Sequence, residues 1–206
     1  MTEPEELTVN MPTLECLLGE KLTAFAPHTT GVPLRKKKEL EIAKQLFDVA
    51  ILSEQMNDQL QFRTTNDKAV AEELAFRGLE LTREDVLQDT IRACASIISR
   101  GAYDAEDYAE YMKGIRAISD HILGRRFTPE IAAEKACSVM CLAASVLTQT
   151  KYPKIANPKE YMKARLVGGQ YKRLGYIRKR NLGAYSYLVE ATKMLETIWS
   201  KNVNVL

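Results

Sequence analysis

The sequence has few of the residues that usually build metal centres or nucleophilic sites. It contains two histidines and four cysteines in 206 residues, and neither a Gly-Ser dipeptide nor an Asp-x-Asp pair occurs. A glycine-rich phosphate loop, a serine elbow and a His-Glu-x-x-His helix are also missing. No apolar run reaches the roughly 18 residues of a membrane span, and the acidic N-terminus lacks the apolar segment of a secretory signal. We therefore expect a cytoplasmic protein with reduced thiols and no membrane contact.

The few cysteines and histidines do not form a convincing ligand set. Cys137 and Cys141 are four residues apart on one expected helix, where two thiolates can bind zinc, but no second pair with matching spacing occurs. We expect buried free thiols and no metal site. His28 and His121 are expected to be surface or half-buried residues.

Charge is unevenly distributed along the chain. Its 29 Lys and Arg nearly balance 27 Asp and Glu, yet residues 151–180 hold ten cations and one acid. Four tyrosines alternate with these cations: Tyr152, Tyr161, Tyr171 and Tyr176. Because cations neutralise phosphates and aromatic rings stack on bases, the pattern is typical of RNA binding. The candidate nucleic-acid-binding residues are Lys172, Arg173, Arg178, Lys179 and Arg180. The alternative is a basic face that pairs with the acidic remainder of the bundle.

Hydrophobic periodicity predicts a mostly α fold, a multi-helix bundle with one short N-terminal strand at Leu7–Met11. Helix starts are indicated at Thr13, at Thr82 with Asp85, and at two positions where Asn or Thr precedes proline, Thr128-Pro129 and Asn157-Pro158. A lone strand cannot satisfy its backbone groups, so it is expected to be disordered, to pair with another chain, or to belong to a sheet outside this sequence. The run Arg35–Lys38 is either a solvated loop or a phosphate contact.

Two stretches resemble one known family. TVNMPTLECLLGEKLTAFAPHTTGVPL (8–34) and KQLFDVAIL (44–52) resemble the AbiEii/AbiGii family of nucleotidyltransferase toxins. That family belongs to bacterial abortive-infection toxin–antitoxin systems. Its first motif, of the L-x-E-K-L-x-A type, matches residues 18–24, and its second, of the (K/R)-D-x-x-D type, matches residues 44–48.

The resemblance implies transfer of a nucleotidyl group from an NTP, with Mg²⁺, to an RNA acceptor, with tRNA as the candidate and a cognate antitoxin as a further partner. Lys21 and Asp48 are the implied catalytic residues: Lys21 contacts a nucleotide phosphate, and Asp48 orients the phosphate or a catalytic group. Lys21 and Lys44 are the implied nucleotide-binding residues. The residues alone also permit a simple helical ion pair between Lys44 and Asp48, and a snorkelling Lys21.

The sequence departs from the family pattern in three places. The Gly-Ser loop and the Asp-x-Asp pair that the family uses for triphosphate and metal do not occur, and Gln45 stands where an acid is usual. We therefore predict that this chain alone is inactive. It is interpreted as the C-terminal helical part, or a shortened homologue, of an AbiEii-like enzyme. Residues 1–60 are then a nucleotidyltransferase remnant with a strand and two helices, and residues 61–206 are a helical bundle. The alternative is a non-catalytic module that binds RNA or an acidic protein through residues 151–180.

Overall fold

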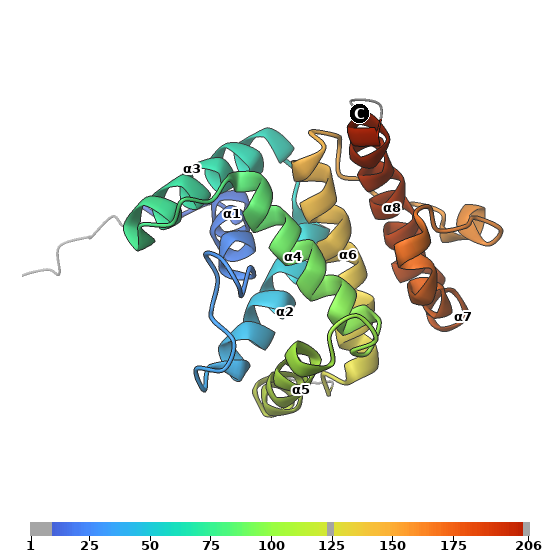
Figure 1. The fold of residues 1–206 in the computed structure, drawn as a ribbon, viewed down its shortest axis with the longest axis horizontal. Helices are drawn as coiled ribbons and strands as arrows, with labels where there is room; N and C mark the ends of the chain where they lie inside the picture. Colours follow the sequence, from blue (N-terminus) through green and yellow to red (C-terminus); the bar gives the residue numbers. More distant parts are fainter. Residues whose placement is uncertain (1–9, 123–125, 204–206) are drawn as a thin grey trace, which may run out of the picture.

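Helices make up almost all of the regular structure (Figure 1). The computed structural model describes residues 10–122 and 126–203, with side chains to Ile198. The α-helices are α1 (Leu14–Ala24), α2 (Glu39–Gln55), α3 (Gln59–Arg77), α4 (Arg83–Ile98), α5 (Ala105–Ile118), α6 (Pro129–Leu147), α7 (Ile177–Arg180) and α8 (Leu182–Val203). Short 3₁₀ helices are η1 (Ser119–His121), η2 (Pro158–Tyr161) and η3 (Gly169–Tyr176). The prediction of a mostly α bundle is confirmed.

The expected N-terminal strand is not confirmed. Residues 7–9 of Leu7–Met11 lie outside the described residues, and Asn10 and Met11 have no regular structure. Met11 is 82% exposed. The physical reason is the lack of a partner, because the described part of the chain contains no other strand with which a ladder could form.

Side-chain caps fix where the helices begin. Thr13, Thr82 and Thr128 each accept a hydrogen bond from a main-chain N–H in the first turn of α1, α4 and α6, as the sequence predicted. Asp58 does the same for α3. Asn157 opens only the short helix η2.

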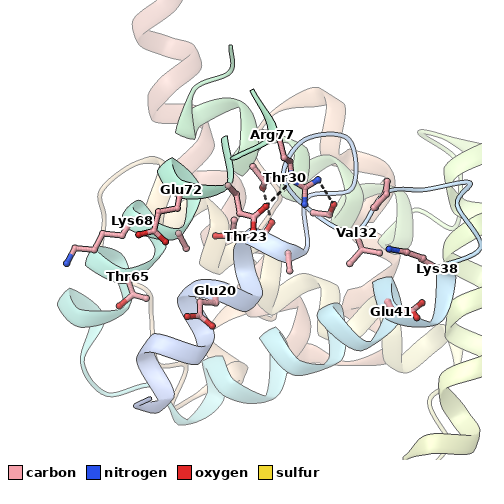
Figure 2. Close-up of a pocket in the computed structure, with 15 residues that line it drawn as sticks. Glu20, Thr23, Thr30, Val32, Lys38, Glu41, Thr65, Lys68, Glu72 and Arg77 are labelled. Atoms are coloured by element: carbon pink, nitrogen blue, oxygen red, sulfur yellow. Dashed lines mark hydrogen bonds and ion pairs between the residues drawn. The ribbon is translucent and has the colours of Figure 1, made fainter. Parts of the chain in front are cut away.

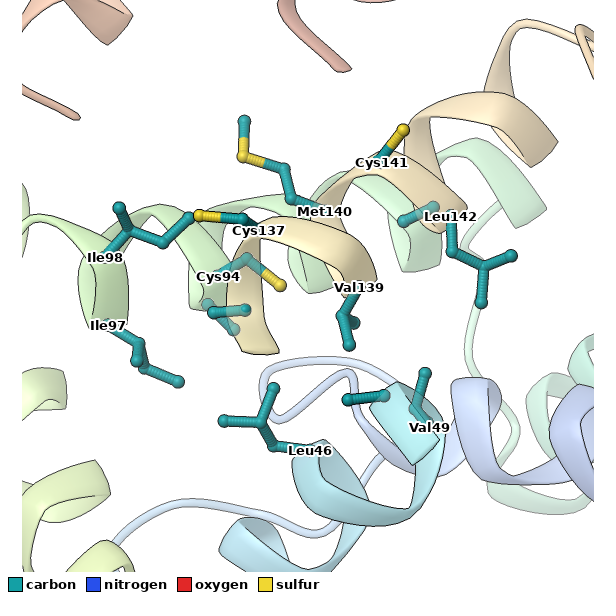
Figure 3. Close-up of a cluster of buried hydrophobic side chains, with 14 of the residues drawn as sticks. Leu46, Val49, Cys94, Ile97, Ile98, Cys137, Val139, Met140, Cys141 and Leu142 are labelled. Carbon is teal, nitrogen blue, oxygen red and sulfur yellow. The ribbon is translucent and has the colours of Figure 1, made fainter. Parts of the chain in front are cut away.

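The core is centred on α6, whose small and apolar residues are buried on nearly every side. α6 packs against α4, α8 and α2. Figure 3 shows Cys137, Val139 and Met140 of α6 together with Ile97 of α4 and Leu46 of α2. One apolar cluster extends from Leu18 in α1 to Leu195 in α8, so α6 connects the N-terminal helices to the C-terminal ones.

Within the described residues, none of the helices is long and apolar enough to cross a lipid bilayer.

Candidate functional site

The fold brings Lys21 and Asp48 together. Lys21 lies in the last turn of α1 and Asp48 lies in the middle of α2, and their Nζ and Oδ2 atoms are 2.8 Å apart. The two side chains are 35% and 37% exposed, so the ion pair contributes at most about 1 kcal/mol to stability. Both charges therefore remain open to a ligand while each holds the other in place.

Lys44 takes no part in this ion pair. It is exposed on α2 one turn before Asp48, and Asp48 binds Lys21 and not Lys44. The simple helical pair between Lys44 and Asp48 is therefore not what the structure contains. Gln45, on the adjoining face of α2, has a buried side-chain oxygen that accepts no hydrogen bond from the described residues.

A pocket of about 640 Å³ lies between α1, α3 and the loop that leads to α2 (Figure 2). Its wall includes Ala24, one turn after Lys21, and Glu41, two turns before Asp48 on the same face of α2. The Lys21–Asp48 pair therefore stands beside this pocket, although neither residue lines it. Lys38 and Lys68 bring two exposed ammonium groups to the rim.

The loop between α1 and α2 is held by buried acids. His28 donates its main-chain N–H to Asp89 Oδ2 at 2.7 Å, and its two ring nitrogens lie 2.9 Å from Asp89 Oδ1 and Asp107 Oδ2. Arg35 donates to Asp107 Oδ1 at 2.8 Å. Asp89 is completely buried, so these contacts fix the wall of the pocket that the loop provides.

Sequence reasoning missed this network, and no local signal indicated it. Asp89 and Asp107 lie on α4 and α5, far from His28 in the chain, and nothing in their spacing links them to the loop. Arg35 is 52% exposed but is not an unpaired loop cation, because Asp107 and Glu106 bind it. Lys36, Lys37 and Lys38 are exposed, as expected of a solvated loop.

The cations of residues 151–180 are all exposed. None of them forms an ion pair within 4 Å with the residues whose side chains are described, so pairing with the acidic remainder of the bundle is not observed. Lys172 and Arg173 lie on η3, and Arg178, Lys179 and Arg180 form the end of α7. We call this set the basic strip, and it consists of Lys151, Lys154, Lys159, Lys163, Arg165, Lys172, Arg173, Arg178, Lys179 and Arg180.

The tyrosines of this segment do not form the expected stacking platform. Tyr152 is 3% exposed and stacks on Tyr187, with ring centroids 5.6 Å apart. Tyr171 is 8% exposed, and burial raises its pKa to about 12. Both rings belong to the main apolar cluster, together with Leu174 and Ile177 of the same segment.

The two remaining rings are covered by cations. Lys193 Nζ lies 5.6 Å from the centroid of Tyr161, and Arg100 Cζ lies 5.6 Å from that of Tyr176. Tyr176 also donates its hydroxyl to the Ile98 carbonyl oxygen at 2.7 Å. Two of the four rings are therefore buried, and the other two are half-buried with a cation over one face.

The cysteines are free thiols, as predicted. Burial raises the pKa of Cys94, Cys137 and Cys141, which keeps these thiols protonated and inert. His121 is exposed at the end of η1. Among the described residues, no group of three or more His, Cys, Asp or Glu side chains is placed to hold a metal ion.

The protein is helical, and its candidate site is an ion pair between residues of the two sequence motifs, Lys21 and Asp48. The comparison with known families agrees with this description. The family model described as "Nucleotidyl transferase AbiEii toxin, Type IV TA system" matches residues 1–125. Because the match covers more than half of the chain, the protein belongs to the AbiEii nucleotidyltransferase toxin family. No curated protein and no solved structure is significantly similar to the chain.

The Lys21–Asp48 pair does not fit a Mg²⁺ site. Mg²⁺ takes oxygen ligands in octahedral geometry, usually with one or two carboxylates, whereas the Asp48 carboxylate is bound to the Lys21 ammonium and no second acid joins it. The chain also has no Asp-x-Asp pair.

Proposed function

We propose that Lys21 and Asp48 contribute to nucleotidyl transfer from an NTP to an RNA acceptor. The observation that supports this most is the ion pair at 2.8 Å, which joins the two motif residues from separate helices beside an open pocket. A family that transfers nucleotides needs cations at the triphosphate, and Lys21 is a partly exposed cation held in a fixed place.

In this proposal the acceptor hydroxyl attacks the α-phosphorus of the NTP, and the bond to the β-phosphate breaks to release pyrophosphate. The Lys21 ammonium neutralises charge on the phosphate oxygens, and Asp48 holds Lys21 in position. Lys44, exposed on the same face of α2 as Asp48, adds a second cation for the triphosphate.

A charge exchange separates this role from a structural one. Lys21→Asp combined with Asp48→Lys retains an ion pair between α1 and α2, so the thermal midpoint should stay close to that of the wild type. Binding of a fluorescent NTP, measured for each of the four nucleotides, should weaken at least about tenfold in the exchanged protein, because the cation has moved (about 1.4 kcal/mol). Lys113→Met, which removes an exposed lysine from an ion pair on α5, is the matched control. Unchanged NTP affinity in the exchanged protein would contradict the role.

Transfer itself should fail with this chain alone. Labelled NTP, Mg²⁺ and tRNA are expected to give no labelled RNA, because the acids that hold metal against the triphosphate are not in the sequence. Incorporation that disappears in Lys21→Ala would contradict this expectation and would place the whole activity in the chain.

A second candidate function is a non-catalytic module that binds RNA or an acidic protein. The observation that favours it is the basic strip, whose ten cations are exposed and have no acidic partner within the described residues. RNA binding without NTP binding would support this candidate over the first. Cytoplasmic location and a cognate antitoxin partner are part of the same proposal for both candidates.

A further inference from the structure

We infer that the basic strip binds the phosphate backbone of double-helical RNA, and not unpaired bases. The inference rests on the proposed contact with RNA and adds the form of RNA that the surface accepts. Two separate observations support it: the cations lie exposed along one segment, and the tyrosine rings of that segment are buried or contact other side chains.

The two ends of the strip lie near opposite ends of α6. At one end, Lys154 donates to Asn57 Oδ1 at 3.0 Å, beside the C-terminal end of α6. At the other end, Asn181, directly after Arg180, donates to Glu134 Oε2 at 2.8 Å in the N-terminal half of α6. From Glu134 to Leu147 the helix rises about 20 Å at 1.5 Å per residue. Figure 1 shows this segment, in orange, beside α8, and its first residues contact the start of α3 through Tyr152 and Gln59.

The cations project outward because the apolar residues between them are buried. Leu174 and Ile177 are buried against the bundle, and the residues that flank them, Arg173 and Arg178, are exposed. η3 and α7 therefore present an apolar side to the core and a cationic side to solvent. Ten exposed cations with a single acid among them, Glu160, match a row of phosphates.

Within residues 151–180 unpaired bases find no fully exposed ring, and beside the segment Tyr103 is 39% exposed with its hydroxyl donating to the Gln170 carbonyl oxygen. Proteins that bind single strands without sequence preference add exposed aromatic rings to a positive groove. In this segment Tyr152 stacks on Tyr187, Tyr171 is buried, and cations cover Tyr161 and Tyr176. Double-helical RNA is recognised by shape and by phosphate and 2′-hydroxyl contacts, for which no free ring is needed.

Fluorescence anisotropy with the full chain tests this inference. The probes are a perfectly paired RNA hairpin, an unstructured RNA with the same number of phosphates, and a DNA hairpin of the same length. We expect the RNA hairpin to bind at least about tenfold more tightly than the unstructured RNA. Equal or tighter binding of the unstructured RNA would overturn the inference but leave RNA binding intact.

Two sets of variants locate the contact. Arg178→Ala, Lys179→Ala and Arg180→Ala together should weaken hairpin binding at least about tenfold and reduce the slope of log K against log salt by about three. Lys36→Ala, Arg92→Ala and Arg116→Ala remove three exposed cations outside the strip and should leave affinity within about threefold. Equal effects of the two sets would show attraction by net charge alone and would overturn the assignment.

A third variant examines stacking directly. Tyr161→Leu removes a half-buried ring and should change RNA affinity by less than about twofold, because Lys193 lies over that ring and a base is not expected to stack on it. A loss of fivefold or more, with an unchanged circular dichroism spectrum, would contradict a phosphate-only contact. Displacement of the hairpin by polyglutamate of equal charge at equal concentration would indicate an acidic protein partner instead. Absence of binding to any RNA at low salt would refute the RNA contact itself.

Discussion

Asp89 is a buried acid with several hydrogen-bond partners. It is completely buried, and it accepts hydrogen bonds from the His28 main chain and from the Thr29 hydroxyl at 3.0 Å, with the His28 ring beside it. Asp89→Ala leaves these donors without an acceptor, so we expect the free energy of unfolding to fall by about 2–3 kcal/mol. Urea denaturation measures the change. Asp120→Ala, at an exposed residue, should change stability by less than about 0.5 kcal/mol, and a similarly small effect at Asp89 would contradict the buried network.

Single residues differ in how well the sequence foretold their roles. Lys21 and Asp48 were named because each lies in a short motif of the family; the structure brings their charged atoms together, and their catalytic roles stay a prediction. The contacts of His28 with Asp89 and Asp107 could not be predicted from the sequence, because they depend on how α4 and α5 pack against the loop between α1 and α2. The tyrosines of residues 151–180 were misjudged, since alternation with cations describes their order in the chain and not the direction of their rings.

Two helix starts depend on carboxylates that accept main-chain N–H groups. Thr82 N–H donates to Asp85 at the start of α4, and the N–H groups of Asn57 and Asp58 donate to Glu15 of α1. These hydrogen bonds lower the pKa of both acids. Since the folded-state pKa values lie below the unfolded values of about 3.9 and 4.3, the stabilisation is complete above that range and is lost as the pH falls through the folded values.

The expected result is a decline in thermal midpoint below about pH 5. Glu15→Gln with Asp85→Asn should flatten this decline, because neither side chain then titrates. Glu72→Gln, at an exposed residue on α3, is the control and should leave the slope unchanged. Scanning calorimetry from pH 3 to pH 7 provides the measurement (the range brackets the unfolded carboxyl pKa values of about 4). Parallel curves for the double variant and the wild type would show that these two acids contribute nothing to acid sensitivity.

A glycine sets the distance between α2 and α5. A Cβ on Gly114 would overlap the carbonyl oxygen of Glu39 and approach the Ala43 side chain, so the two helices meet where no side chain fits. We expect Gly114→Ala to lower the free energy of unfolding by about 2 kcal/mol, because overpacking outweighs the gain of about 1 kcal/mol in helix propensity. Gly175→Ala should leave the free energy of unfolding nearly unchanged, because a Cβ at that position would have no neighbouring atom within 4 Å. Chemical denaturation of both variants measures these changes. A Gly114→Ala protein more stable than the wild type would contradict the close contact between α5 and α2 at this glycine.

Helices were predicted well where a cap and an apolar stripe agreed. α4 and α6 begin where Thr82 and Thr128 indicated, since a threonine hydroxyl at that position satisfies the main chain without help from distant residues. Asn157 carries the same local signal, but the chain after η2 continues as irregular structure. There, packing of the tyrosines against α8 and α4 decides the path of the chain, and no local pattern encodes it.

At the scale of the whole molecule, the family match covers fewer residues than the folded core. The match ends at residue 125, before α6 begins, while α6 fills the centre of the core and packs against α2 and α4. The residues of the matched part that face α6 include Leu46, Val49 and Ile97, all buried (Figure 3). The part that carries Lys21 and Asp48 therefore depends on residues outside the family match for its stability.

Truncation after residue 125 tests this dependence. Without α6, the apolar faces of α2 and α4 are exposed to water, at a cost of roughly 25 cal/mol for each Å² of apolar surface. We expect the truncated chain to lose its sharp thermal transition, to bind the dye ANS and to keep only part of its helical circular dichroism signal. The full chain should show one cooperative transition and little dye binding. If the truncated chain unfolded as sharply as the full chain, the N-terminal helices would form an independent unit, and α6 would then serve the basic strip and not the Lys21–Asp48 site.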